Sequence, residues 1–222
     1  MKVFFPFLAA GLLVAKAVAG EAGELTDAEK QGRALVATLM AENSTETYSR
    51  TGVMKVRDRE RRWTEIPFRL QIVVTPTNRA AAFEITDPVT ANSLTNAFKD
   101  AQMATPIAGS DFWVGDLAME FLGWPGQRVL KSEMRRGRSC KVLESVNPEP
   151  GRGRYRRVVT WIDNDTGGIV QAEAYDEANK LLKKFEPKDV KKVRGRWEVK
   201  EMRLRNVQTG TQTVMEFDLP GE

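Results

Sequence analysis

Apolar and polar residues alternate with a period of two over much of this 222-residue chain. Successive side chains of a β-strand point to opposite faces of a sheet, so this alternation is typical of strands with one buried face. The predicted strands recur at about 8–12-residue spacing and are joined by short polar turns. The pattern favours a large antiparallel sheet or barrel, and we predict a mainly β (α+β) fold.

The expected strands fall in ten segments: residues 48–56, 68–74, 81–85, from 129 onward, 140–146, 156–161, 169–175, 181–186, 197–204 and 213–219. Residues 147–154 are rich in Pro and Gly and are expected to form a loop. Residues 87–107 fit a strand and a helix equally well, and both alternatives stay open.

Two helices are expected beside the strands. Residues 25–41 carry apolar side chains at helical spacing, and Thr26 followed by Glu29 predicts a capping box at their start. A short second helix is expected from Ser110 and Asp111, as capping residues, through Phe121. Residues 123–126 (GWPG) would end it.

The first 19 residues resemble a secretory leader. Lys2 precedes an uncharged run of 13 residues, 3–15, which is shorter than the roughly 20 residues that a membrane-spanning helix needs. Residues 17–19 (AVA) provide a cleavage pattern. We therefore predict export to the periplasm and one β-rich domain over residues 20–222, with an uncleaved anchor or a hydrophobic strand as the alternatives.

Charge and cysteine content narrow the possible partners. Removal of Lys2 and Lys16 with the leader lowers the formal net charge from +4 to +2, and such a balance gives no strong attraction for nucleic acid. Cys140 is the single cysteine, so an intrachain disulfide is impossible, and we expect this thiol to lie in the core.

Histidine is absent from the sequence, which excludes Ser-His-Asp and Cys-His catalytic systems in their usual form and histidine-bearing zinc sites. Asp111, Asp116 and Glu120 could form a carboxylate cluster that provides a general acid and a general base, but helix caps and solvated faces explain them more simply. Residues 163–167 (DNDTG) suggest a hairpin turn, because Ala174 stands where a calcium loop needs glutamate. We expect no enzyme, no cofactor and no metal.

Basic clusters occupy residues 135–138, 152–157 and 183–196. Solvated strand edges are the favoured interpretation. If these residues bind a ligand, anionic lipid head groups suit an exported protein better than nucleic acid does.

Short motifs in the second half are similar to the LolA-like outer-membrane lipoprotein-sorting proteins. They are residues 109–112 (GSDF), 116–117 (DL), 161–163 (WID), 173–176 (EAYD), 180–183 (KLLK), 195–197 (GRW) and 211–213 (TQT). The resemblance implies an open, curved antiparallel sheet, a half-barrel whose concave side is covered by helices. It also implies a periplasmic carrier that shields the acyl chains of lipoproteins or related lipids from water.

The acyl chain would bind a concave apolar face, and every buried methylene contributes about 0.8 kcal/mol. A movable lid is expected from Phe112, Trp113, Phe121 and Trp124. The remaining lining positions are Phe68, Leu70, Ile72, Val74, Phe83, Ile85, Val159, Trp161, Met215 and Phe217. For any one of them an ordinary core role is the simpler alternative.

Three hypotheses about function follow from the sequence. The first is a lipoprotein or lipid carrier that has transient membrane contact and a possible membrane transport complex as partner. The second is a non-transporting cell-envelope module that binds a protein. The third, the least favoured, is a hydrolase that uses Asp111 and Asp116.

Overall fold

The computed structural model describes residues 24–42, 48–74, 79–86, 93–97, 104–151 and 154–219. The predicted leader, residues 1–19, lies outside these ranges. No helix in the described ranges is both long and apolar enough to span a bilayer.

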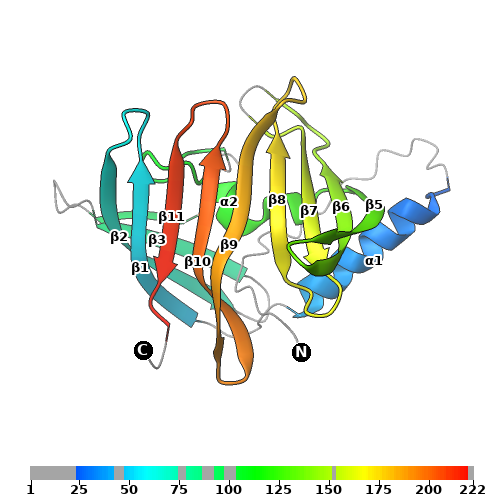
Figure 1. The fold of residues 1–222 in the computed structure, drawn as a ribbon, viewed down its shortest axis with the longest axis horizontal. Coiled ribbons are helices and arrows are strands. Elements are labelled where there is room, and N and C mark those ends of the chain that lie inside the picture. The colour runs from blue at the N-terminus through cyan, green and yellow to red at the C-terminus, as the bar shows by residue number, and fades with distance from the viewer. Residues whose placement is uncertain are drawn as a thin grey trace.

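One antiparallel sheet of eleven strands dominates the fold, in the order β4-β3-β2-β1-β11-β10-β9-β8-β7-β6-β5 (Figure 1). The strands are β1 (Tyr48–Arg57), β2 (Trp63–Val74), β3 (Arg79–Thr86), β4 (Ser93–Ala97), β5 (Gly126–Arg135), β6 (Arg138–Val146), β7 (Arg157–Asp163), β8 (Ile169–Tyr175), β9 (Leu181–Val193), β10 (Arg196–Asn206) and β11 (Gln212–Phe217). The predicted mainly β, open antiparallel fold is therefore confirmed. Neighbouring strands follow one another in sequence except at β1, which pairs with β11.

The pairing between β8 and β9, which joins β5–β8 to the rest of the sheet, is short. β8 pairs with β9 only from Ala172 opposite Phe185 to Tyr175 opposite Leu181. Beyond Phe185, β9 continues beside β10 but without a partner from β8. The two strands diverge toward the lower end in Figure 1, and this divergence leaves a cleft that is described below.

Helix α1 (Asp27–Glu42) packs against β5 at one end of the sheet (Figure 1). The predicted capping box is confirmed: the Glu29 backbone N–H donates to Thr26 Oγ1 at 3.3 Å, and the Thr26 N–H donates to Glu29 Oε2 at 2.8 Å. Gly32 lets the helix lie close to the strand, because a Cβ at this position would lie 2.6 Å from the Arg128 Cα. The side chains packed on the main core are those of Leu35, Val36, Leu39 and Met40.

The second helix differs from the expected one. It is reduced to α2 (Val114–Ala118) and a 3-10 turn, η2 (Glu120–Gly123), separated by Met119 at φ 46°. Its N-cap is Trp113, whose N–H donates to Asp116 Oδ2 at 2.8 Å, so the predicted caps Ser110 and Asp111 are wrong. Helix α2 lies behind the sheet in Figure 1.

The main core lies between the sheet and these short helices, while a smaller cluster forms on the outer face. The smaller cluster contains Cys140, Val142, Val159, Trp161 and Val170. Cys140 is fully buried as predicted, and burial raises the pKa of its thiol.

Val159 and Trp161 were expected on the concave face, and that expectation is wrong. On β7 the concave positions belong to Val158 and Ile162, which are in the main core. Both faces of this strand are buried, so a period of two could not tell which set of side chains points inward.

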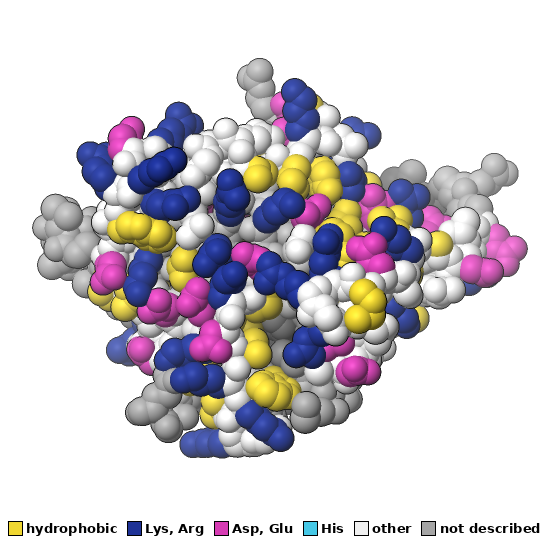
Figure 2. Space-filling view, viewed as in Figure 1, with side chains coloured by type: hydrophobic (Ala, Val, Ile, Leu, Met, Phe, Trp, Pro, Cys, Tyr) yellow, Lys and Arg dark blue, Asp and Glu magenta, His cyan; other side chains and the backbone are white. Residues whose placement is uncertain are grey.

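The outer face of β1 and β9–β11 is covered by interleaved cations and carboxylates (Figure 2). Cross-strand pairs include Lys55 with Glu216 at 2.7 Å and Lys184 with Glu173 at 3.0 Å. The interpretation of the basic clusters as solvated residues fits Lys184, whose side chain is 43% exposed. It fails for Lys183, whose side chain is 3% exposed.

Residues 87–107, left open by the sequence, contain β4 from Ser93 to Ala97. Pro106 forms an isolated antiparallel bridge with Trp113. Residues 87–92 and 98–103 lie outside the described part of the chain.

Candidate functional site: an apolar pocket with a buried polar triad

A pocket of about 540 Å³, open on one side, lies between the concave face of β8–β10 and the segment 104–125 that carries α2 and η2. We call this segment the lid. The clear space within the pocket holds roughly two or three water molecules. An acyl chain can therefore enter only when side chains of the lining move aside.

The sheet side of the pocket is roomy because β8 carries small residues there. Ala172 and Ala174 line it, opposite the longer side chains of Phe185, Met202 and Leu204 on β9 and β10. A register shift in the β7–β8 pairing separates Ile169 from Gln171, so Ile169 and Ala172 reach the same face although they are three residues apart.

The lid contributes Phe112, Met119 and Phe121 to the pocket. Two of these were predicted from the sequence, Phe112 and Phe121. Trp113 and Trp124 also lie on the lid and line a smaller pocket beside Tyr155.

A buried polar triad of Asp116, Tyr155 and Lys183 joins the lid to the sheet. The Lys183 ammonium lies 3.1 Å from Asp116 Oδ2, and the Tyr155 hydroxyl donates to Asp116 Oδ1 at 2.7 Å. Lys183 also lies 3.6 Å from the centroid of the Trp113 ring, which stacks on Tyr155 at 4.4 Å. Each member thus has a charged, hydrogen-bonding or aromatic partner.

Burial sets the proton affinities in this region. Loss of hydration lowers the pKa of Lys183, against the opposing effect of Asp116, and raises the pKa of Tyr155, whose ionised form Asp116 also disfavours. Asp111 is 8% exposed, and burial raises its pKa in spite of hydrogen bonds from Thr211 and Thr213.

Two more attachments hold the lid. Asp111 accepts hydrogen bonds from the hydroxyls of Thr211 at 2.5 Å and Thr213 at 3.1 Å, at the start of β11. The side-chain amide of Gln127 on β5 donates to the carbonyls of Phe121 at 2.9 Å and Trp124 at 2.8 Å. The lid is therefore attached to the rest of the molecule at Asp111, at Asp116 and near its C-terminal end.

The carboxylates considered for acid–base chemistry have structural partners instead. Asp116 caps α2 as expected, but neither Asp111 nor Asp116 lies on a solvated face. Within the described ranges, no group of three or more His, Cys, Asp or Glu side chains is arranged so that it could hold a metal ion. Residues 163–167 form the predicted turn between β7 and β8, with Asp163 accepting from the Thr166 hydroxyl at 2.5 Å.

The other predicted lining residues divide into two groups. Phe68, Leu70, Met215 and Phe217 are buried in the main core, and Phe68 meets Phe217 edge to face at 5.4 Å. The side chains of Ile72, Val74, Phe83 and Ile85 lie outside the described part of the structure.

Several pocket residues were missed by the sequence analysis. Ala172, Ala174, Met202 and Leu204 could have been found from the alternation in β8 and β10. Lys183 could not, because a lysine in a basic strand carries no local sign of burial.

Comparison with known proteins supports the fold. Residues 93–219 match a family model that is described as an uncharacterized protein, and no curated protein matches the chain. A DUF1329 family protein from Desulfovibrio piger superposes with a TM-score of 0.72 at 19% identity, over 87% of this chain and 92% of that one.

Two other solved structures are similar. A candidate outer membrane lipoprotein-sorting protein domain from Vibrio parahaemolyticus has a TM-score of 0.72 at 18% identity, covering 86% of this chain and 92% of its own. A LolA superfamily protein from Nitrosomonas europaea has a TM-score of 0.61 at 13% identity, covering 85% and 94%. The chain thus belongs to the family whose model matches residues 93–219, and its fold is LolA-like.

Proposed function

We propose that this protein is an exported carrier of lipoproteins or lipids, which binds acyl chains non-covalently in the pocket under the lid. One observation carries the proposal: the concave face leaves an apolar space where β8 has alanines, and a separately attached segment covers it. The LolA-like fold supports a lipoprotein-sorting or carrier role.

Burial of the chain provides the favourable energy for such a role. About ten methylenes would contribute about 8 kcal/mol when removed from water, and the net affinity is this gain minus the cost of association and of moving the lining side chains aside. The lid would open by separation of Asp116 from Lys183 and Tyr155, so that Met119 and Phe121 can move off the pocket. Catalysis has no part in this cycle.

Fluorescence titration of the delipidated protein with a fatty-acyl fluorophore tests the proposal. We expect saturable binding with micromolar or tighter affinity, and competition by unlabelled fatty acid. Ala172→Phe would fill the pocket and weaken binding about tenfold or more. Val159→Phe, in the smaller cluster on the outer face, serves as the matched control and should bind like the wild type.

Absence of saturable binding would refute the carrier and favour the non-transporting module. In that case crosslinking in the cell envelope should capture a protein partner whether or not lipid is present. Equal binding by both phenylalanine variants would instead place the acyl site outside this pocket.

A further inference from the structure

A second cavity opens where β8 and β9 diverge. It has a volume of about 550 Å³ and is lined by residues from the β5–β6 hairpin, the β7–β8 turn, the start of β8 and β9. Ile169 lines both this cavity and the apolar pocket under the lid, so the two cavities adjoin each other. A ligand whose tail occupied the pocket could place its polar end here.

The charged side chains of the cleft are mainly basic. Arg136, Arg138 and Lys188 line it, with Asp163 as the one acidic lining residue among the described residues. Asp163 is 2% exposed and is already engaged by Arg138 at 2.9 Å and by the Thr166 hydroxyl. It therefore holds Arg138 in place and presents little negative charge to the opening.

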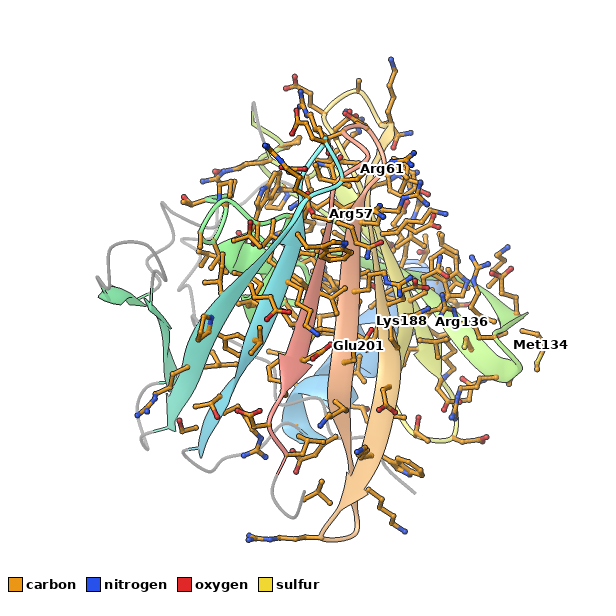
Figure 3. The ribbon with its side chains drawn as sticks, turned by 60° about the vertical axis from the view of Figure 1, so that its left-hand side comes forward. Arg57, Arg61, Met134, Arg136, Lys188 and Glu201 are labelled. Atoms are coloured by element: carbon orange, nitrogen blue, oxygen red, sulfur yellow. The ribbon has the colours of Figure 1, made fainter. Side chains whose placement is uncertain are left out.

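A similar arrangement orients the other two cations. Glu186 on β9 pairs with Arg136, which reaches across from the β5–β6 hairpin, and lies 3.6 Å from Lys188 and 3.7 Å from Arg203. Arg136 and Lys188 are neighbours in Figure 3, and they lie below Arg57 and Arg61, which are at the β1–β2 hairpin.

The Glu186 carboxylate is thus shared by three cations, which leaves an excess of positive charge around it. Partial desolvation, with the adjacent Arg203 and Arg136, lowers the pKa of Lys188, while Glu201 opposes the shift. The side chains of Arg136, Arg138 and Lys188 remain 42%, 50% and 30% exposed, so an incoming anion can reach them.

We propose that this cleft binds the phosphate head group of an anionic lipid whose acyl chain lies in the apolar pocket. Phosphate oxygens accept charge-assisted hydrogen bonds from guanidinium groups, often two at once, and from ammonium groups as point charges. The inference rests on the proposed carrier function and specifies its cargo, adding a charged recognition site to the apolar one.

Two lipids that differ only in the phosphate test this assignment: 1-lauroyl-glycerol 3-phosphate and 1-lauroyl-glycerol, each used below its aggregation concentration. Calorimetric titration of the delipidated protein should show the phosphate lipid binding at least about tenfold tighter. Added salt should reduce the difference, because part of the attraction remains exposed to solvent.

Variants separate the cleft from general positive charge. Arg136→Gln/Lys188→Gln should reduce the preference to about twofold or less and leave the affinity for 1-lauroyl-glycerol unchanged. Arg59→Gln/Arg61→Gln removes the same charge from the exposed β1–β2 hairpin and should keep the full preference. Glu186→Gln should increase the preference, because it removes the carboxylate that the three cations share.

Each outcome decides a different point. Equal affinity for both lipids, unchanged by the cleft variants, would overturn the head-group site but leave the carrier intact. Binding of neither lipid would overturn both proposals. Inorganic phosphate that binds as tightly as the phosphate lipid would overturn the lipid assignment and indicate a site for free phosphate.

Discussion

The ammonium of Lys183 lies 3.1 Å from the carboxylate of Asp116, and this pair joins the central strand β9 to the lid. The lysine side chain is 3% exposed and the aspartate 13%. A buried pair of this kind is weak evidence for stability by itself, but removal of one partner leaves a charge in an apolar environment. When the lid opens, Lys183 would lose its Asp116 counter-ion in the same way, unless water or a ligand took the place of the carboxylate.

Asp116→Asn should therefore destabilise the protein by about 3–5 kcal/mol, since Lys183 would lose its counter-ion while remaining buried. The double variant Asp116→Asn/Lys183→Met should lose much less, because the uncompensated charge is gone. Urea unfolding followed by tryptophan fluorescence measures both. An Asp116→Asn variant as stable as the wild type would show that the pair does not hold the lid.

Tyr155 makes stability sensitive to alkaline pH. Its pKa is raised in the folded state by burial and by Asp116, so the unfolded chain releases this proton first as pH rises above about 10. The contribution is fully present below that pH and declines above it, by about 1.4 kcal/mol per pH unit until the folded-state pKa is reached.

The difference in unfolding free energy between wild type and Tyr155→Phe, measured at pH 9, 10 and 11, isolates this effect because Lys183 is present in both. The difference should shrink as pH rises. A constant difference across the three pH values would mean that Tyr155 ionises alike in both states.

Gly32 controls how closely α1 approaches β5. Gly32→Ala improves helix propensity by about 1 kcal/mol, yet its Cβ would lie 2.6 Å from the backbone of Arg128. We expect net destabilisation of about 1–3 kcal/mol, because the contact is with backbone that cannot rotate away.

Thermal unfolding monitored by circular dichroism provides the measurement. Gly123→Ala is the control, since a Cβ there meets no atom within 4 Å, and its effect should stay within about 0.5 kcal/mol. A stabilised Gly32→Ala protein would show that α1 can shift away from β5 without loss.

The two faces of the sheet should respond differently to aromatic substitutions. Trp161→Phe removes the hydrogen bond to Glu133 and alters the contact with Arg135 on the outer face. It should lower stability by about 1–2 kcal/mol and leave acyl affinity unchanged.

Ala174→Phe, in the pocket, should weaken acyl binding about tenfold, because the added ring occupies the space that the ligand needs. Titration of both variants with the fatty-acyl fluorophore compares them directly. Loss of binding in Trp161→Phe alone would move the acyl site to the outer face.

Much of the fold could be predicted from local patterns. The alternation along the strands, the capping box of Thr26 and Glu29, and the turn at 163–167 are properties of neighbouring residues, and the structure confirms them. Short sequence motifs such as residues 173–176, taken in their order along the chain, were sufficient to indicate the LolA-like fold.

The residues of the site were harder to predict from the sequence than the fold was. The shift between Ile169 and Gln171 moves side chains from one face to the other, and β7 is buried on both faces, so the pattern could not assign Val159 and Trp161 correctly. A helix in the lid was expected from the sequence, but the sequence did not show that Trp113, and not Asp111, caps it.

The sequence by itself determined a strand-rich chain with a buried thiol and no histidine chemistry, because hydrophobic period and residue type act over a few neighbouring positions. The tertiary structure decided that Lys183 is buried against Asp116, which is 67 residues away in sequence, and that Arg136 meets Glu186 across a gap between strands. Such pairs depend on which strands become neighbours and where they diverge, and the free energy that selects them belongs to the packed sheet as a whole.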